Sequence, residues 1–182
     1  MGQSRAIVGA WLPVLAGVLV LALSTMPARA QLSLGSPGAP PYIALGGGAW
    51  NALADTHKPH SQTDAELRGE YHFGDVWWVI SPFIGLSGTS QGGFYGYFGF
   101  GIDINLAPQL VLTPNAAAGY WARGSGLDLG SWWEFRTGAE LDWRFANSTR
   151  LGIAFHHMSN AGLTKTNPGE ESATLVYTVP LH

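Results

Sequence analysis

The sequence predicts an all-β chain, an eight-stranded antiparallel transmembrane β-barrel, and three observations predict this class. Apolar and polar residues alternate with period two in segments of about ten to fourteen residues, which suits tilted membrane-spanning strands. Aromatic residues mark the ends of the apolar faces, as in the girdles of membrane barrels. Short and long connections alternate along the chain, which is typical of periplasmic turns and external loops.

Residues 1–30 have the layout of a secretory signal peptide. Arg5 supplies a positive charge, Ala6–Leu23 is an apolar run, and Ala28–Ala30 is a small-x-small cleavage site before Gln31. We therefore expect residues 1–30 to be a cleaved signal peptide and residues 31–182 to be one outer-membrane β-barrel domain. An uncleaved N-terminal membrane helix is the alternative.

Composition excludes several classes of protein. The chain contains no cysteine, so small secreted folds held by disulfides are excluded. It has 9 basic against 12 acidic side chains and no basic patch, so no nucleic-acid partner is expected. Beyond residues 1–30 no apolar run reaches the length of a spanning helix.

Eight segments carry the alternating pattern of strands. In order along the chain they are Tyr42–Leu53, Asp64–Phe73, Trp77–Ser87, Gly93–Leu106, Gln109–Ala122, Trp132–Phe145, Thr149–Ser159 and Ser172–Leu181. The turns between them at Gly74-Asp75, Ala107-Pro108 and Asn147-Ser148 are short. Pro82 and Pro114 lie inside segments and cannot donate a ladder hydrogen bond, so we expect local bulges there.

The two faces of these segments decide between a soluble and a membrane barrel. In Trp132–Phe145 one face carries Glu, Arg, Glu, Asp and Arg, and the other carries mainly aromatic and aliphatic side chains. Both signs of charge can neutralise one another inside a narrow barrel, whereas the aromatic residues suit membrane interfaces. We therefore expect the apolar faces to contact lipid and the charged faces to line the interior.

Three polar residues extend the apolar faces of the last two segments. His157 and Ser159 continue the stripe that contains Phe155, and Glu171 precedes the stripe of the eighth segment. A neutral histidine can take the proton of a serine, and a carboxylate can orient that histidine. Polar rim residues are the plainer interpretation, but ionisable groups on a lipid-facing stripe are costly and are therefore functional candidates.

Four other ionisable residues are not expected to take part in the chemistry. His156 has inward parity and is expected to form hydrogen bonds in the interior. Glu170 could compete with Glu171 for the histidine, although parity favours Glu171. His57 and His60 are expected to be solvated loop residues rather than metal ligands.

The same residues carry a resemblance to a known family. The stretch His157–Gly162, followed by Asn167, Gly169, Glu171 and Ser172, resembles the C-terminal signature of outer-membrane lipid A 3-O-deacylases of the PagL type. The resemblance implies an eight-stranded barrel in the bacterial outer membrane that hydrolyses the ester-linked acyl chain at position 3 of lipid A.

The resemblance also implies roles for individual residues. Ser159 would be the nucleophile, His157 the base and Glu171 the group that orients the base. The Asn167 side chain and the backbone N–H of Gly162 would stabilise the oxyanion. Asn160 would support the loop, and no metal or other cofactor would be needed.

Two other functions stay open at this point. One is a non-enzymatic small barrel with a structural or adhesive role, and the other is a barrel acyl hydrolase or acyltransferase that acts on phospholipid. The expected partners are lipid A within lipopolysaccharide and the surrounding outer-membrane lipids. The sequence does not fix the oligomeric state, which leaves a homodimer open.

Overall fold

The computed structural model describes residues 32–182 except 36–37, 56–60, 75, 77 and 182. Four expectations lie outside the described residues: the signal peptide in residues 1–30, the histidines His57 and His60, the turn residue Asp75, and the start of the third segment at Trp77. Within the described part of the chain, no helix is long and apolar enough to cross a membrane.

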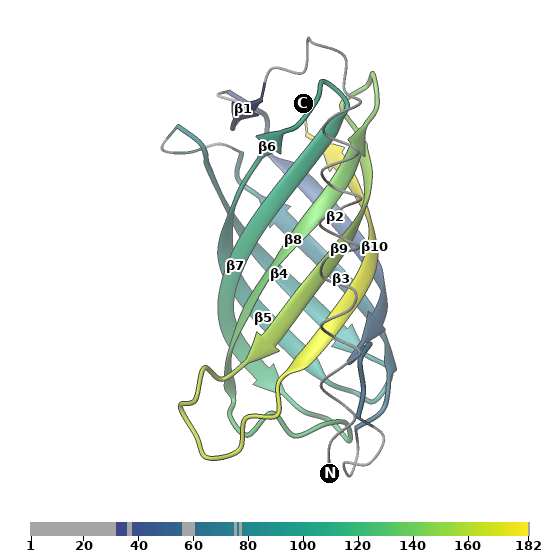
Figure 1. Cartoon of the computed structure of the whole chain (residues 1–182), viewed down its shortest axis with the longest axis vertical. Helices are drawn as coiled ribbons and strands as arrows, with labels where there is room; N and C mark the ends of the chain where they lie inside the picture. The colour runs from purple at the N-terminus through teal and green to yellow at the C-terminus, as the bar shows by residue number, and fades with distance from the viewer. Residues whose placement is uncertain (1–31, 36–37, 56–60, 75, 77, 182) are drawn as a thin grey trace, which may run out of the picture. The chain divides into compact units, whose positions relative to one another are not determined.

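Eight long strands form a closed antiparallel barrel (Figure 1). They are β2 (Tyr42–Trp50), β3 (Asp64–His72), β4 (Ile80–Thr89), β5 (Phe94–Ile102), β7 (Leu110–Ala122), β8 (Trp133–Arg144), β9 (Arg150–Ser159) and β10 (Glu170–Pro180). Each pairs with the next one in this order, and β10 pairs with β2, so no long edge is left open. The predicted eight-stranded barrel is confirmed.

Two short strands, β1 (Ser33–Leu34) and β6 (Ile104–Asn105), extend the sheet beside β7. They lie at the end of the barrel where β10 finishes, and the loop between β9 and β10 lies at the other end (Figure 1). The sequence pattern did not predict β1.

The alternation of side chains follows the expected inside-out arrangement. Along β3 the five polar or charged positions are buried, while Leu67 on the other face is 75% exposed. Along β9 the even positions are buried and Ile153 is 64% exposed. The apolar stripes therefore form the outer wall, which is the arrangement of a membrane barrel.

The interior is filled by a charged network centred on Glu70. Its carboxylate accepts hydrogen bonds from Arg136 and from the Tyr97 hydroxyl, each at 2.8 Å. The Arg68 guanidinium lies 3.5 Å away and His72 Nε2 lies 3.0 Å away. All five side chains are buried, so opposite charges offset one another where water is excluded.

Replacing Glu70 with alanine should strongly destabilise the barrel. The change leaves Arg68 and Arg136 buried without their shared carboxylate, which typically costs about 3–5 kcal/mol. Urea unfolding in lipid vesicles measures this cost. Asp128→Ala is the matched control, because its ion pair with Arg123 is largely exposed and is worth about 0–1 kcal/mol. Equal losses in the two variants would contradict the network.

Aromatic and aliphatic side chains close the interior at the end that carries the β9–β10 loop. Trp50 and Trp121 stack with ring centroids 5.4 Å apart. Leu127 and Leu129, from the loop between β7 and β8, are buried in the same cluster. This loop is therefore anchored to the barrel and can support the neighbouring loop.

The fourth predicted segment is interrupted, and the predicted bulges are wrong. The β7 register is continuous past Pro114, but the ladder opposite it breaks between β5 and β6 at Asp103. Proline cannot donate to the strand that faces it, so the ladder opens there without an extra residue. Asp103 instead accepts a side-chain hydrogen bond from Thr113 at 2.8 Å. The β4–β5 register likewise runs unbroken through Pro82, which lies just past the end of the β3 ladder.

Candidate active site

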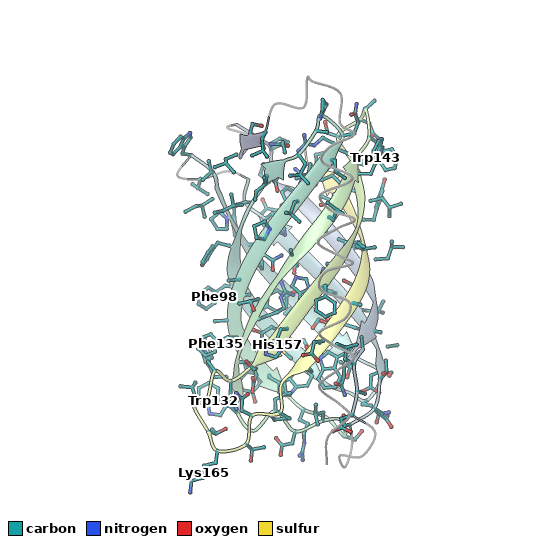
Figure 2. All side chains as sticks on the ribbon, viewed as in Figure 1. Phe98, Trp132, Phe135, Trp143, His157 and Lys165 are labelled. Carbon is teal, nitrogen blue, oxygen red and sulfur yellow. The ribbon has the colours of Figure 1, made fainter. Side chains whose placement is uncertain are left out.

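His157 and Glu171 meet on the outer surface where β9 ends and β10 begins. They are direct cross-strand partners, and His157 Nδ1 lies 3.3 Å from Glu171 Oε1. The two side chains are 47% and 31% exposed, on the same face as Phe155. Figure 2 shows His157 on the barrel wall, far from Trp143 at the opposite end. β10 begins at Glu170, two residues before the predicted start, which places Glu171 within the ladder.

Ser159 lies two residues after His157 on the same face of β9. It is half-buried at the last position of the strand, opposite Phe135 on β8. No hydrogen bond joins Ser159 to His157 in the described residues, and such bonds are often long before substrate binds. Because Nδ1 faces Glu171, Nε2 is the nitrogen that remains to exchange a proton with a hydroxyl.

The neighbours of these residues point into the barrel, as parity predicted. His156 Nδ1 lies 3.0 Å from Arg68 Nη1, and its Nε2 lies 3.1 Å from Asn115 Oδ1. Arginine only donates, so Nδ1 accepts and Nε2 carries the proton. Glu170 is buried and accepts a hydrogen bond from the Asn51 backbone at 3.0 Å. His156 and Glu170 are therefore interior residues, and Glu171 is the carboxylate beside His157.

Asn160 organises the loop that follows Ser159. Its side chain is fully buried, and Nδ2 lies within hydrogen-bond distance of Leu129 O, Thr164 Oγ1 and Thr166 O at 2.8, 2.9 and 2.8 Å. Its backbone N–H donates to Asn167 Oδ1 at 3.0 Å. One side chain thus ties the β9–β10 loop to itself and to the β7–β8 loop.

Gly162 and Asn167 lie in this loop, but both already contact Asn160. The Gly162 N–H donates to Asn160 Oδ1 at 3.0 Å. Asn167 uses its side-chain oxygen toward Asn160, so its Nδ2 group is the donor that remains. The Gly162 N–H is therefore already engaged, whereas no hydrogen bond of the described residues engages Asn167 Nδ2.

Two contacts of the site were missed by sequence reasoning. Gly169 has a positive φ of 66°, and a Cβ atom there would lie 2.8 Å from His157 Cε1 and 3.4 Å from Nε2. The loop backbone therefore passes directly against the imidazole. The carbonyl of Leu129, some thirty residues earlier, also accepts from Asn160. No local sequence signal could reveal this second contact, because it joins two separate loops.

An apolar groove runs along the outer wall beside these residues. Its volume is about 490 Å³, and its lining includes Phe155, Ile153 and Leu141, with Ala139 and Ala173 providing small side chains. Phe155 precedes His157 on the same stripe, and Ala173 follows Glu171. The groove therefore begins next to the polar group and offers a surface for a hydrocarbon chain.

Comparison with known proteins agrees with this architecture. A crystal structure of the outer membrane enzyme PagL is similar, with a TM-score of 0.61 and 20% identity over 77% of this chain and 99% of that chain. A structure described as de novo design of transmembrane β-barrels is also similar, with a TM-score of 0.51 and 12% identity over 80% of this chain and 99% of that chain. No match was found among curated proteins.

The family model for the lipid A 3-O-deacylases matches residues 46–180, which is most of the chain. That range includes every candidate residue from His157 to Glu171. The closed barrel, its apolar outer wall and this match identify the chain as an outer-membrane acyl hydrolase. The chain belongs to the PagL family of lipid A 3-O-deacylases.

Proposed function

We propose that this protein removes the ester-linked acyl chain at position 3 of lipid A as a serine ester hydrolase. Ser159 is the nucleophile, His157 the base and Glu171 the group that orients the base. One observation carries the proposal: His157 and Glu171 lie 3.3 Å apart on the lipid-facing wall, beside Ser159 and above an apolar groove.

The first half of the reaction transfers the acyl chain to the enzyme. The Nδ1–H of His157 donates to Glu171, so Nε2 is free to accept the Ser159 proton. Ser159 Oγ then bonds to the ester carbonyl carbon, and the carbonyl oxygen becomes an oxyanion. When the bond to the sugar oxygen breaks, His157 returns the proton to that oxygen, and the deacylated sugar leaves.

The second half releases the fatty acid. A water molecule gives a proton to His157 Nε2 and attacks the acyl-serine carbonyl carbon. The bond between Ser159 Oγ and that carbon breaks, Oγ regains a proton from His157, and a free fatty acid leaves. In both halves the oxyanion needs a donor, for which the Nδ2 group of Asn167 is suited, with the Gly162 N–H as a second donor.

The position of the site explains how a lipid with several chains could reach it. The interior is filled by side chains such as Glu70 and Arg136, so a bulky lipid has no room there. A site on the outer wall receives lipid A by diffusion within the leaflet. All three proposed catalytic residues come from one chain, so the reaction needs no second copy, although a homodimer is compatible with it.

Mass spectrometry of lipid A tests the proposal. Cells that make the protein should yield lipid A lighter by one ester-linked acyl chain, together with the matching free fatty acid. Cells without the protein should retain that chain. An unchanged lipid A profile would favour a non-enzymatic barrel. Loss of a phospholipid chain, or gain of a chain on lipid A, would assign the site to a different barrel enzyme.

A further inference from the structure

Two arginines face each other at the end of the barrel opposite His157. Arg144 on β8 and Arg150 on β9 are direct cross-strand partners. Arg150 is buried in the interior, and Arg144 is half-buried on the same face of the sheet. Like charges directly opposite one another destabilise a ladder. Such a local conflict is expected mainly at functional sites.

The charge of Arg150 is offset within the barrel. Its Nη2 donates to Asp103 Oδ2 at 2.6 Å, and its guanidinium carbon lies 5.5 Å from the Tyr42 ring centroid. Asp103 also accepts from Thr113, so each of its carboxylate oxygens accepts a hydrogen bond from a group of the barrel. Arg150 is therefore a structural ion-pair partner. It also lines a cavity at this end of the barrel.

Arg144 forms no ion pair among the described residues, and only the more distant carboxylates of Asp103 and Asp142 offset part of its charge. Its Nη2 donates to the neutral amide oxygen of Asn105 at 2.7 Å. No carboxylate of the described residues lies within 4.0 Å of it, whereas Arg68, Arg136 and Arg150 each have one. Its guanidinium has further N–H donors for which the described residues provide no hydrogen bond.

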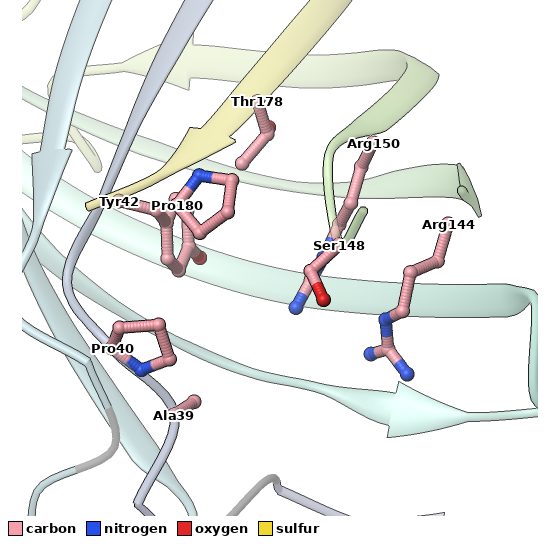
Figure 3. Close-up of a pocket in the computed structure, with 8 residues that line it drawn as sticks. All are labelled: Ala39, Pro40, Tyr42, Arg144, Ser148, Arg150, Thr178 and Pro180. Carbon is pink, nitrogen blue, oxygen red and sulfur yellow. The ribbon is translucent and has the colours of Figure 1, made fainter. Parts of the chain in front are cut away.

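Both arginines line one cavity of about 250 Å³ (Figure 3). The hydroxyl residues Tyr42, Ser148 and Thr178 contribute to the lining, and its other members are Ala39, Pro40 and Pro180. None of the described residues that line it is acidic. Asp142, two positions before Arg144 on β8, is buried and lies outside the lining. The cavity thus presents two cations and several hydroxyls without a carboxylate.

We propose that this cavity is a binding site for a phosphate group. The planar guanidinium fork matches phosphate oxygens, and the charged hydrogen bonds it forms are among the stronger ones in proteins. A bound phosphate also offsets the repulsion between the paired arginines. The source is either free phosphate or a phospholipid headgroup. Exposed Trp143 and Phe145 lie at the same end, and such aromatic belts lie at headgroup level.

Binding measurements on the purified barrel in maltoside detergent, which contains no phosphate, test the site. Inorganic phosphate and a short-chain phosphatidylglycerol are titrated separately by calorimetry. Arg144→Gln should weaken binding by about tenfold or more, as expected for loss of a charged hydrogen-bond fork. Arg123→Gln, which changes an exposed external arginine, should bind like the wild type. Binding of phosphate itself identifies a general phosphate site, and binding of the lipid alone identifies a headgroup site.

A stability measurement separates a ligand site from a structural role. Without ligand, Arg144→Gln should unfold at the same or a higher urea concentration than the wild type, because it removes the like-charge pair. Arg144→Lys keeps the charge but loses the fork, so it should bind more weakly than the wild type. The proposal is overturned if neither phosphate nor phosphatidylglycerol binds the wild type. It is also overturned if Arg144→Gln binds them as tightly as the wild type does, or if Arg144→Gln unfolds at a clearly lower urea concentration than the wild type.

Discussion

Replacing Ser159 or His157 with alanine should lower the rate of lipid A deacylation by about four orders of magnitude or more. Each change removes a group that forms or protonates the breaking bond, and the members of a triad act as a unit. The two losses should therefore be similar, and the double variant should be little worse. Release of fatty acid from lipid A by the purified variants measures the effect.

Glu171→Ala should cost less than either change, because Glu171 orients His157 and does not react itself. All variants should migrate as folded barrels, since these side chains lie on the outer wall. Ser125→Ala provides a matched control: this serine lies in an external loop, where it contacts Gln91. Full activity in Ser159→Ala would exclude it as the nucleophile.

Replacing Gly169 with alanine should lower the turnover number by about a hundredfold, although Gly169 contributes no side chain to the chemistry. The added Cβ would lie 2.8 Å from His157 Cε1, which is too close for two carbon atoms. Either the imidazole or the loop must move. Movement of the imidazole alters both its contact with Glu171 and the direction of Nε2. The effect should fall mainly on turnover, with KM nearly unchanged.

Gly92→Ala is the matched control for this change. Gly92 has a φ of 78°, and a Cβ there meets nothing within 4 Å. Both substitutions place a side chain on a left-handed backbone, which costs about 1–2 kcal/mol. Only the Cβ of Gly169→Ala would clash with the His157 imidazole. Equal activity in the two variants would show that the loop tolerates a side chain beside His157. A loss in Gly169→Ala that came with unfolding would show a structural role instead.

The alternation of residues was enough to predict the barrel and the faces of its strands. Side chains of a strand point to opposite sides in turn, so one run such as Asp64–Phe73 fixes which residues share a face. The same rule placed His157 and Glu171 outside and His156 inside. The register of the antiparallel β9–β10 ladder added that His157 and Glu171 face each other.

What the sequence could not predict depends on contacts between distant segments. The carbonyl of Leu129 reaches Asn160 because the β7–β8 loop folds into the end of the barrel, and nothing local signals that path. The expectation of a bulge at Pro114 was also wrong, because the missing N–H of a proline removes a ladder hydrogen bond and does not require an extra residue. Pro114 opens the ladder opposite it at Asp103 without adding a residue, because β7 keeps its register on both sides.

Identification of the residue that carries the acyl group tests the central claim most directly. A fluorophosphonate that reacts with activated serines should add one adduct to the purified, active barrel, and peptide mass spectrometry should locate it on Ser159. Labelling should disappear in His157→Ala, since the serine is then no longer activated. An adduct on another residue, or a fully active enzyme that resists labelling, would contradict a Ser159–His157–Glu171 site on the lipid-facing wall.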